Sequence, residues 1–321
     1  MKQLLKDRTF GTVVLAVILI ILMGSSRPPV TSGLYPSEYW ALKADWYHCA
    51  DILLVGDSRT LCGLSPEEMQ KYFPNSTIYN YGFGGAWFST QYLDKIETIL
   101  NPDRRQRTIV MGITPHSLTK RDIQTGSFFE IMSMKKSEKF FSTRLPKLAY
   151  LIEPWSFKDA IEEIKPKEKI TRTKKTLCPD GWISIQDDPD SIEKGLRKYM
   201  GFYKERLVDP CNVDNIVRYV DKWVKQGIKV YGFIPPSCQE MYDLELKISG
   251  IDAPMLIDRF RAAGGIWIDT DPGIYDCVDG SHLRDTDARK FTNDLCRELI
   301  KRERPDATGV HDRVDKKQKT G

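Results

Sequence analysis

A serine and a histidine–aspartate pair, far apart in the sequence, have the residue types that acyl-transfer chemistry requires. The run Asp51-Ile-Leu-Leu-Val55 is followed directly by Gly56-Asp57-Ser58-Arg59. A short apolar run predicts a buried parallel strand, and the small and polar residues behind it predict a sharp turn into a helix. A serine in that turn lies at the carboxyl end of the sheet, where α/β proteins bind ligands. The pattern favours Ser58 as a nucleophile, although an Asp-Ser pair is also a typical helix cap.

The histidine–aspartate pair lies in Asp279-Gly-Ser-His-Leu283, before a segment whose pattern predicts a helix from Thr286 to Lys301. A serine is a weak nucleophile until a histidine accepts its proton, and a carboxylate orients that histidine and stabilises the imidazolium. Asp279 and His282 are three residues apart, so one tight turn lets both face a common centre. His282 is therefore the predicted base and Asp279 its orienting acid. The alternative is an ordinary turn before a helix.

Together these segments resemble the SGNH, or GDSL-type, hydrolase superfamily, including its membrane-tethered bacterial branch of polysaccharide O-acyltransferases and esterases. Gly56-Asp57-Ser58 resembles the nucleophile block, Asn80-Tyr-Gly-Phe-Gly-Gly85 the glycine block and Asp279-Gly-Ser-His-Leu283 the Asp-x-x-His block, in the family's order. The resemblance implies an oxyanion hole formed in part by the N–H groups of Ser58 and Gly85. It also implies a flavodoxin-like fold. The matched segments cover roughly residues 50–120 and 212–300.

One block departs from the family pattern. The family ends a strand with Gly-x-Asn-Asp, whereas the equivalent stretch here reads Gly112-Ile-Thr-Pro115, so the asparagine that donates to the oxyanion is missing. The hydroxyl of Thr114 is the candidate replacement donor. His116 follows at once and is a rival base, but no carboxylate stands near it in the sequence to orient it. We therefore expect His116 to contact substrate or to lie at the surface with its hydrogen bonds satisfied.

Two more residues are candidate substrate contacts. Arg59 directly follows Ser58, and its guanidinium has two interpretations. It either hydrogen-bonds an anionic or polyhydroxylated acceptor, or it braces the insertion by pairing with Asp57 or a more distant carboxylate. Asn80 opens the glycine block at the predicted end of a strand. No cofactor is expected, and no metal site is predicted, because the seven cysteines include no Cys-x-x-Cys spacing.

Strands and helices alternate from Asp51 onwards, which predicts a parallel sheet with right-handed crossovers. The predicted fold is a three-layer α/β/α sandwich around a parallel sheet of about five strands. We expect the domain to span residues 51–301, with an insertion at about 117–205 and a disordered charged tail at 302–321. Predicted strands lie at 51–55, 77–81, 108–111, 229–233 and 266–269, and predicted helices at 65–72, 87–100 and 212–226 and in a stretch ending near 263.

The insertion breaks the alternation and is rich in lysine. Because glutamates are interleaved with the lysines and the net charge of the chain is only +4, a solvated helical face is favoured over an anion-binding surface. No nucleic-acid partner is expected. Trp155, Trp182 and Tyr199 either stack on sugar rings or belong to the core. We expect the insertion to lie over the edge of the active site, where loops commonly determine specificity.

The N-terminal segment has the pattern of a membrane-targeting sequence. Lys2, Lys6 and Arg8 precede an uncharged run from Phe10 to Met23, and positive charge before such a run favours a cytoplasmic N-terminus. The favoured interpretation is a single-pass anchor at 1–24, an extended linker at 25–50 and a domain outside the cytoplasm. Because the run is short and Gly24-Ser25-Ser26 offers small residues to signal peptidase, secretion after cleavage is the alternative.

The expected function follows from the resemblance, since the spacing alone indicates only serine chemistry. We expect an extracytoplasmic serine-dependent acyl-ester hydrolase or O-acyltransferase that acts on a cell-envelope or exported glycan through an acyl-serine intermediate. The expected partners are that glycan, the membrane and a polytopic acyltransferase that supplies acyl groups. The alternative is a catalytically inactive binding or assembly module of an envelope polysaccharide complex, which would account for the missing asparagine donor.

Overall fold

A five-stranded parallel sheet forms the centre of the protein. The computed structural model describes residues 8–303 except 26, 48, 121–125, 154–172 and 189. The strands pair in the order β2-β1-β3-β6-β7, and every pairing is parallel. The prediction of an α/β fold around a parallel sheet of about five strands is therefore confirmed. The strands are β1 (Ile52–Gly56), β2 (Ile78–Asn80), β3 (Thr108–Gly112), β6 (Lys229–Phe233) and β7 (Ile266–Trp267).

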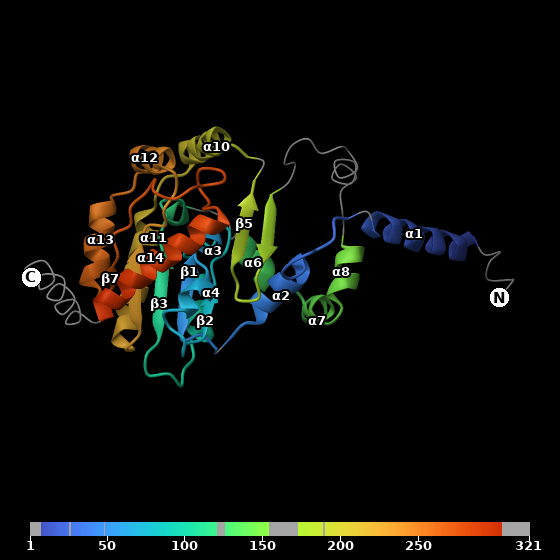
Figure 1. The fold of residues 1–321 in the computed structure, drawn as a ribbon, viewed down its shortest axis with the longest axis horizontal. Helices are drawn as coiled ribbons and strands as arrows, with labels where there is room; N and C mark the ends of the chain where they lie inside the picture. The colour runs from blue at the N-terminus through green and yellow to red at the C-terminus, as the bar shows by residue number, and fades with distance from the viewer. Residues whose placement is uncertain are drawn as a thin grey trace, which may run out of the picture.

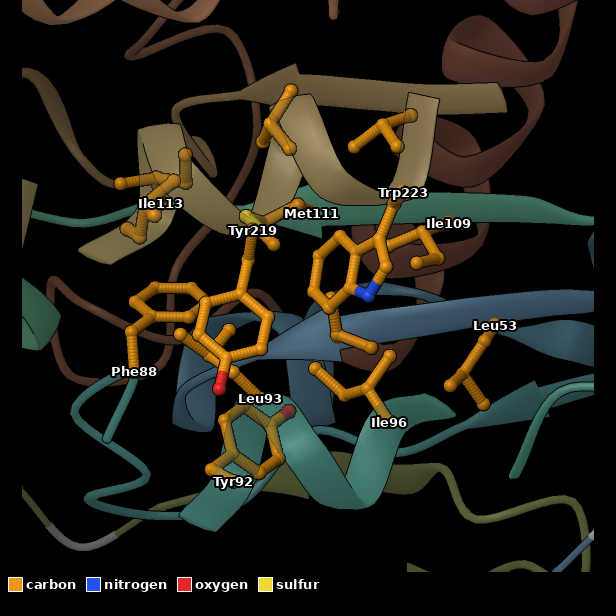
Figure 2. Close-up of a cluster of buried hydrophobic side chains, with 14 of the residues drawn as sticks. Leu53, Phe88, Tyr92, Leu93, Ile96, Ile109, Met111, Ile113, Tyr219 and Trp223 are labelled. Atoms are coloured by element: carbon orange, nitrogen blue, oxygen red, sulfur yellow. The ribbon is translucent and has the colours of Figure 1, made fainter. Parts of the chain in front are cut away.

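Helices cover both faces of this sheet. β1 and β3 are buried along their whole length, as expected for apolar strands without a solvent-facing side. In β1, Leu53 and Val55 join one apolar cluster, while Ile52 and Leu54 join another on the opposite face. Figure 2 shows the first cluster, in which side chains of α5 and α11 pack against the strands. The first face is covered by α5 (Thr90–Ile99), α11 (Pro210–Lys225) and α13 (Ala253–Ala262), and the second by α4 (Pro66–Gln70), α12 (Gln239–Ile248) and α14 (Asp285–Glu303).

The order of the strands fixes where a ligand site is expected. Numbered by their rank in the main sheet, the strands follow the flavodoxin-like order 2-1-3-4-5. Chain connections on the two sides of the first strand then run in opposite directions, which opens a crevice at the carboxyl ends of β1 and β3. The helix α3 (Ser58–Gly63) begins directly after β1, and Thr114 follows β3. The predicted nucleophile therefore lies at the topological switch point.

The N-terminal region differs from its prediction. It contains α1 (Arg8–Ser25) and α2 (Pro36–Asp45), and residues 1–7 lie outside the described part. None of the described helices has the length and apolarity needed to cross a membrane, so the predicted single-pass anchor is not confirmed. The linker is not simply extended either. A proline in the first turn favours α2, which buries the side chains of Tyr39 and Lys43 against the domain.

The insertion consists of short elements with different neighbours. α7 and α8 pack against α2, and α8 also packs against α1, on one flank of the protein (Figure 1). α10 packs against α12 at the end of the central sheet. Of these helices, α10 lies at the end of the central sheet, whereas α7 and α8 lie on the flank. The bounds are η2 (His116–Leu118), α6 (Ser127–Met132), α7 (Lys136–Arg144), α8 (Pro146–Ile152), the antiparallel pair β4 (Lys174–Leu177) and β5 (Ile183–Asp187), and α10 (Ile192–Glu205). The predicted tail beyond 303 lies outside the described residues.

Candidate active site

Ser58 is presented by a tight turn between β1 and α3. Every residue in 51–66 is buried except Ser58, which is partly exposed. Gly56 permits the turn because its φ is +149°, and a Cβ there would lie 2.5 Å from the carbonyl oxygen of Gly112. Asp57 caps α3 by accepting a hydrogen bond at 3.0 Å from a backbone N–H of the first turn. Because Asp57 is the cap, the Ser58 hydroxyl is left for another partner.

The fold brings Ser58, His282 and Asp279 into one hydrogen-bonded chain. Ser58 Oγ lies 2.9 Å from His282 Nε2, and His282 Nδ1 lies 2.8 Å from Asp279 Oδ2. Burial alone would raise the pKa of Asp279, but the hydrogen bonds from the ring and backbone of His282 and from the Ser281 N–H hold that pKa well below its usual range. The ionised carboxylate only accepts hydrogen bonds, so it keeps the imidazole proton on Nδ1. Nε2 is then free to accept the Ser58 hydroxyl proton.

The turn that carries His282 is held by its own backbone. The Val278 N–H donates to the His282 carbonyl oxygen at 2.9 Å, and Cys277 and Leu283 form an antiparallel bridge. The Arg284 N–H donates to the Asp276 carbonyl oxygen at 3.0 Å. The segment 276–284 is therefore a closed loop between β7 and α14, as the sequence predicts. This closure fixes the position of the imidazole relative to the start of α14.

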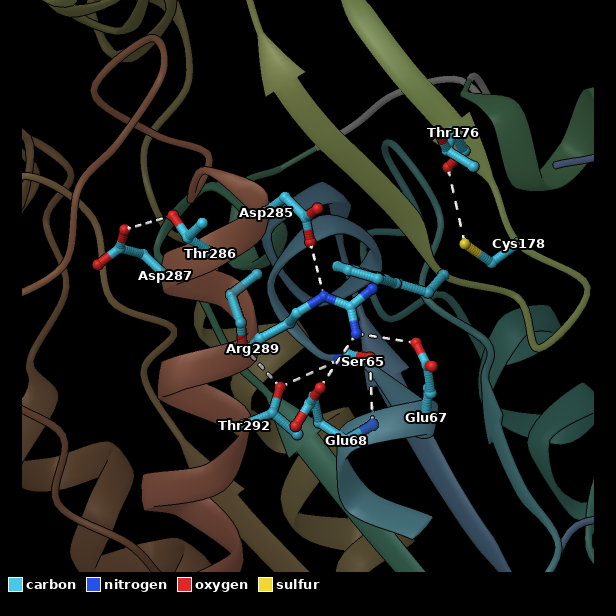
Figure 3. Close-up of polar contacts among 12 residues, drawn as sticks. Ser65, Glu67, Glu68, Thr176, Cys178, Asp285, Thr286, Asp287, Arg289 and Thr292 are labelled. Carbon is cyan, nitrogen blue, oxygen red and sulfur yellow. Dashed lines mark hydrogen bonds and ion pairs between the residues drawn. The ribbon is translucent and has the colours of Figure 1, made fainter. Parts of the chain in front are cut away.

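Ion pairs connect α14, the helix after His282, to α4, which follows α3 in the chain. Arg289 of α14 bonds Glu67 and Glu68 of α4 at 2.8 and 3.0 Å, as Figure 3 shows. The Ser65 N–H, at the start of α4, donates to Thr292 Oγ1 of α14 at 3.0 Å. These contacts join two segments that are distant in the sequence. They tie α14, which follows the His282 turn, to α4, which follows the Ser58 segment.

The expected oxyanion donors are available. No described residue accepts a hydrogen bond from the N–H of Ser58 or from that of Gly85. The glycine loop is tied to the end of β1, because the Phe83 N–H donates to the Gly56 carbonyl oxygen at 3.0 Å. Tyr92 reinforces the same junction by accepting from the Gly56 N–H at 3.0 Å. Neither N–H group is therefore used by another described residue, as an oxyanion donor requires.

Thr114 does not replace the missing asparagine. Its hydroxyl is fully buried and donates to the Asp57 carboxylate, while it accepts from the Ser117 N–H at 3.0 Å. A hydroxyl has one proton, so the proton used by Asp57 is not available to an oxyanion. The expectation that Thr114 belongs to the oxyanion hole is wrong. Thr114 instead holds the carboxylate that caps α3.

Asn80 also has a structural role in place of the expected substrate contact. It is fully buried, and Nδ2 donates to the carbonyl oxygens of Thr60 and Leu64 at 2.9 and 2.8 Å. Its Oδ1 accepts from the Gly82 N–H at 3.0 Å. Each of these bonds goes to backbone, so the amide connects the end of β2 to α3. The side chain does not face a substrate.

Arg59 is a brace and not an acceptor contact. The residue is 3% exposed, so a polymeric acceptor does not reach its guanidinium. Nη1 pairs with Glu245 of α12 at 2.7 Å, and Nε donates to Ser281 Oγ at 3.0 Å. Burial alone would lower the pKa of Arg59, but the neighbouring Glu245 carboxylate raises it well above its usual range. Of the two interpretations of Arg59, the structure supports the brace, with a distant carboxylate as its partner.

His116 lies in a cluster of aromatic rings. Its ring is 4.3 Å from that of Phe202, 5.5 Å from Tyr199 and 5.9 Å from Trp87, measured between centroids. The partner of Ser58 Oγ is His282, so His116 does not occupy the position of the base. Among the predicted sugar-stacking residues, Trp182 is a core residue and Trp155 lies outside the described part of the chain.

Two contributors to the site were missed by the sequence analysis. Ser281 lies inside the Asp279–His282 block, but nothing in that block indicates which residue its hydroxyl contacts. Glu245 lies on α12, far from every motif. The sequence held only a weak indication of the region that these two residues contact. Tyr199 and Tyr203 are four residues apart, so they share one face of a helix.

No metal or family assignment adds to this geometry. Within the part of the chain that the structure describes, no group of three or more His, Cys, Asp or Glu side chains could hold a metal ion. No protein-family model matches the chain, and neither a curated protein nor a solved structure matches it.

Proposed function

We propose that this protein is a serine-dependent acyl-ester hydrolase or O-acyltransferase that works through an acyl-serine intermediate. The observation that carries the proposal is the unbroken hydrogen-bond chain from Ser58 Oγ through the His282 imidazole to the Asp279 carboxylate. This arrangement provides a nucleophile, a base and a group that orients the base. The resemblance to SGNH-type hydrolases favours an ester substrate.

The proposed reaction has two displacements. Ser58 Oγ attacks the carbonyl carbon while His282 Nε2 takes the hydroxyl proton, and Asp279 stabilises the resulting imidazolium. The N–H groups of Ser58 and Gly85 donate to the oxyanion. When the intermediate collapses, His282 returns the proton to the departing alkoxide and the acyl group remains on Ser58. Water or a sugar hydroxyl then attacks the acyl-serine, with His282 again accepting the proton, and serine is regenerated.

A glycan is the proposed substrate or acceptor, located in the cell envelope or exported. Support comes from the SGNH resemblance and from the partly exposed residues Trp87 and Phe202 beside His116, since aromatic faces can stack on sugar rings. The proposal places the domain outside the cytoplasm, exported by the N-terminal segment and released after cleavage, with a polytopic acyltransferase as the source of acyl groups.

One observation favours the second candidate, an inactive binding or assembly module. The Thr114 hydroxyl is used by Asp57, so the position that carries the family's asparagine supplies no oxyanion donor. Removing one such donor from an enzyme typically costs about 10²- to 10³-fold in kcat. A module that retained the fold without turnover would tolerate this loss.

Labelling with a fluorophosphonate probe separates the two candidates. We expect the full chain to be labelled on Ser58 and to hydrolyse a short acyl ester, and Ser58→Ala to lose on the order of 10⁴-fold or more in rate. Ser133→Ala, which changes an exposed serine outside the site, is the matched control and should react normally. A wild-type protein that takes up no label would support the inactive module. Equal labelling of Ser58→Ala would remove Ser58 as the nucleophile.

A further inference from the structure

One hydroxyl connects the segment that carries the candidate nucleophile to the segment that carries the candidate base. Ser281 is 1% exposed and precedes His282 directly, and Arg59 follows Ser58 directly. Ser281 Oγ accepts from Arg59 Nε at 3.0 Å. The same oxygen lies 2.8 Å from the hydroxyl of Tyr199. Ser281 therefore connects α3, α10 and the turn at 276–284 that carries Asp279 and His282, which we call the catalytic turn.

Arg59 is itself held from several sides. Nη1 pairs with Glu245 of α12 at 2.7 Å, and both side chains are 2% exposed. The other oxygen of Glu245 accepts from the Tyr203 hydroxyl at 2.8 Å. The ring of Tyr199 faces the guanidinium, whose Cζ atom lies 5.5 Å from the centroid of the ring. Because the guanidinium is planar and these contacts fix its plane, its Nε–H can point toward Ser281 Oγ in only one orientation.

α10 brings these contacts to the catalytic turn along one face. Gly195, Tyr199 and Tyr203 are spaced four residues apart, so they lie on the same side of the helix. A Cβ on Gly195 would collide with the carbonyl oxygen of Asp279. Glycine thus lets the helix backbone lie directly on the turn, and this close approach places the Tyr199 hydroxyl beside Ser281.

We propose that Arg59 and Tyr199 are positioning residues that act through Ser281 to set the separation between Ser58 and His282. The inference rests on the proposed function, because it explains how that function's nucleophile and base are held in reach of each other. It assigns to α10, an element of the insertion, the task of holding the catalytic turn in place. A displacement of about 1 Å at such a site can reduce the rate by about 10²-fold.

Ser281→Ala and Tyr199→Phe in the full chain test the inference. We expect each to lower kcat for a short acyl ester, and the rate of Ser58 labelling, by about 10-fold with KM unchanged. Tyr199→Phe keeps the ring and removes only the hydroxyl. The matched control is Tyr219→Phe, which removes a hydroxyl bonded at 2.5 Å to the exposed Asp94 of α5, away from the candidate site, and should leave kcat unchanged. Equal kcat in all three variants and the wild type would overturn the inference.

Arg59→Lys adds a test of the route. A lysine keeps the charge but cannot bond both Glu245 and Ser281 in the geometry of the guanidinium. If Arg59 acts through Ser281, the variant Arg59→Lys/Ser281→Ala should be no slower than the slower single variant, because the two changes break one interaction. Losses in kcat that multiply would contradict action through Ser281.

A measurement without turnover separates failure of the inference from failure of the proposed function. The proton on His282 Nδ1, bonded to Asp279, should give a resolved downfield resonance in the ¹H NMR spectrum of the wild type. We expect it to broaden or disappear in Ser281→Ala and Tyr199→Phe and to persist in Tyr219→Phe. If the wild type takes up no label yet this pattern holds, the proposed function fails and the positioning role stands. An unchanged resonance in every variant would overturn the positioning role.

Discussion

Two fully buried cations, Arg59 and Lys43, lie in different parts of the molecule and are accommodated in opposite ways. Arg59, beside the candidate nucleophile Ser58, pairs with the buried carboxylate of Glu245 at 2.7 Å. Lys43 of α2 is 0% exposed and donates to the Gly181 carbonyl oxygen at 2.8 Å and to the Tyr39 hydroxyl at 3.2 Å. Among the described residues, no carboxylate lies within ion-pair distance of its ammonium.

The surroundings of Lys43 are aromatic. Its Nζ lies between 5.0 and 6.0 Å from the centroids of four rings, those of Tyr39, Trp40, Tyr79 and Phe83. Rings attract a cation, but they do not replace the water that burial removes. Burial therefore lowers the pKa of Lys43 well below its usual range, whereas Glu245 raises that of Arg59.

The difference shows what a buried charge requires. Where a carboxylate and oriented hydrogen bonds meet the cation, the charge is retained and its donors can orient a neighbouring segment. Where only neutral acceptors meet it, burial lowers the pKa of the cation, and Lys43 fills space and joins α2 to the turn before β5. The region around Arg59 thus holds a paired charge, whereas the region around Lys43 holds a cation without a carboxylate partner.

Removing the carboxylate should have the largest effect. Glu245→Gln leaves the buried guanidinium without a counter-charge, so we expect a loss of about 3–5 kcal/mol in the free energy of unfolding. Urea unfolding near neutral pH measures it. The control is the double variant Arg59→Met/Glu245→Leu, which removes both charges and should be more stable than Glu245→Gln alone. A single variant within about 1 kcal/mol of the wild type would show that Arg59 does not need its partner.

Lys43→Met should remove a dependence of stability on pH. The pKa of Lys43 is lowered in the folded protein but returns to its ordinary value of 10.5 on unfolding, so the unfolded chain binds the extra proton between those values. The contribution of Lys43 to the free energy of unfolding of the wild type therefore rises with pH between those two pKa values, by up to about 1.4 kcal/mol per pH unit. The advantage of Lys43→Met over the wild type should accordingly shrink as pH rises. Parallel stability profiles for the two proteins would contradict a lowered pKa of Lys43.

The smallest expected loss of stability comes from removing one tyrosine hydroxyl in each of the two regions. Tyr203→Phe removes the second hydrogen bond to Glu245, and we expect it to cost about 1–2 kcal/mol because a buried carboxylate oxygen loses its donor. Tyr39→Phe removes the hydroxyl bonded to the Gly181 carbonyl oxygen, which Lys43 still satisfies, so its cost should be smaller. Thermal unfolding of both variants gives the comparison. If Tyr39→Phe cost more stability than Tyr203→Phe, the charged network around Arg59 would not be the region more sensitive to the loss of a hydrogen bond.

The sequence by itself determined the local features that depend on neighbouring residues. An apolar run that ends in Gly56-Asp57-Ser58 produced the strand, the turn and the helix, because glycine permits the turn and aspartate caps the helix. The spacing of Asp279 and His282 placed both on one closed turn. The alternation of apolar runs with helical segments predicted the parallel sheet and placed these residues at one edge of it.

The partners of the polar side chains were decided by the tertiary structure alone. Arg59 bonds to Ser281 and Glu245, which lie 222 and 186 residues away, and Thr114 bonds to Asp57 across 57 residues. A buried hydrogen-bonding group takes whichever complementary group the packing of distant segments brings within about 3 Å. Residue type and local spacing do not encode that proximity. Arg59, Asn80 and Thr114 therefore carry the correct chemistry for a substrate site and bond to the protein instead.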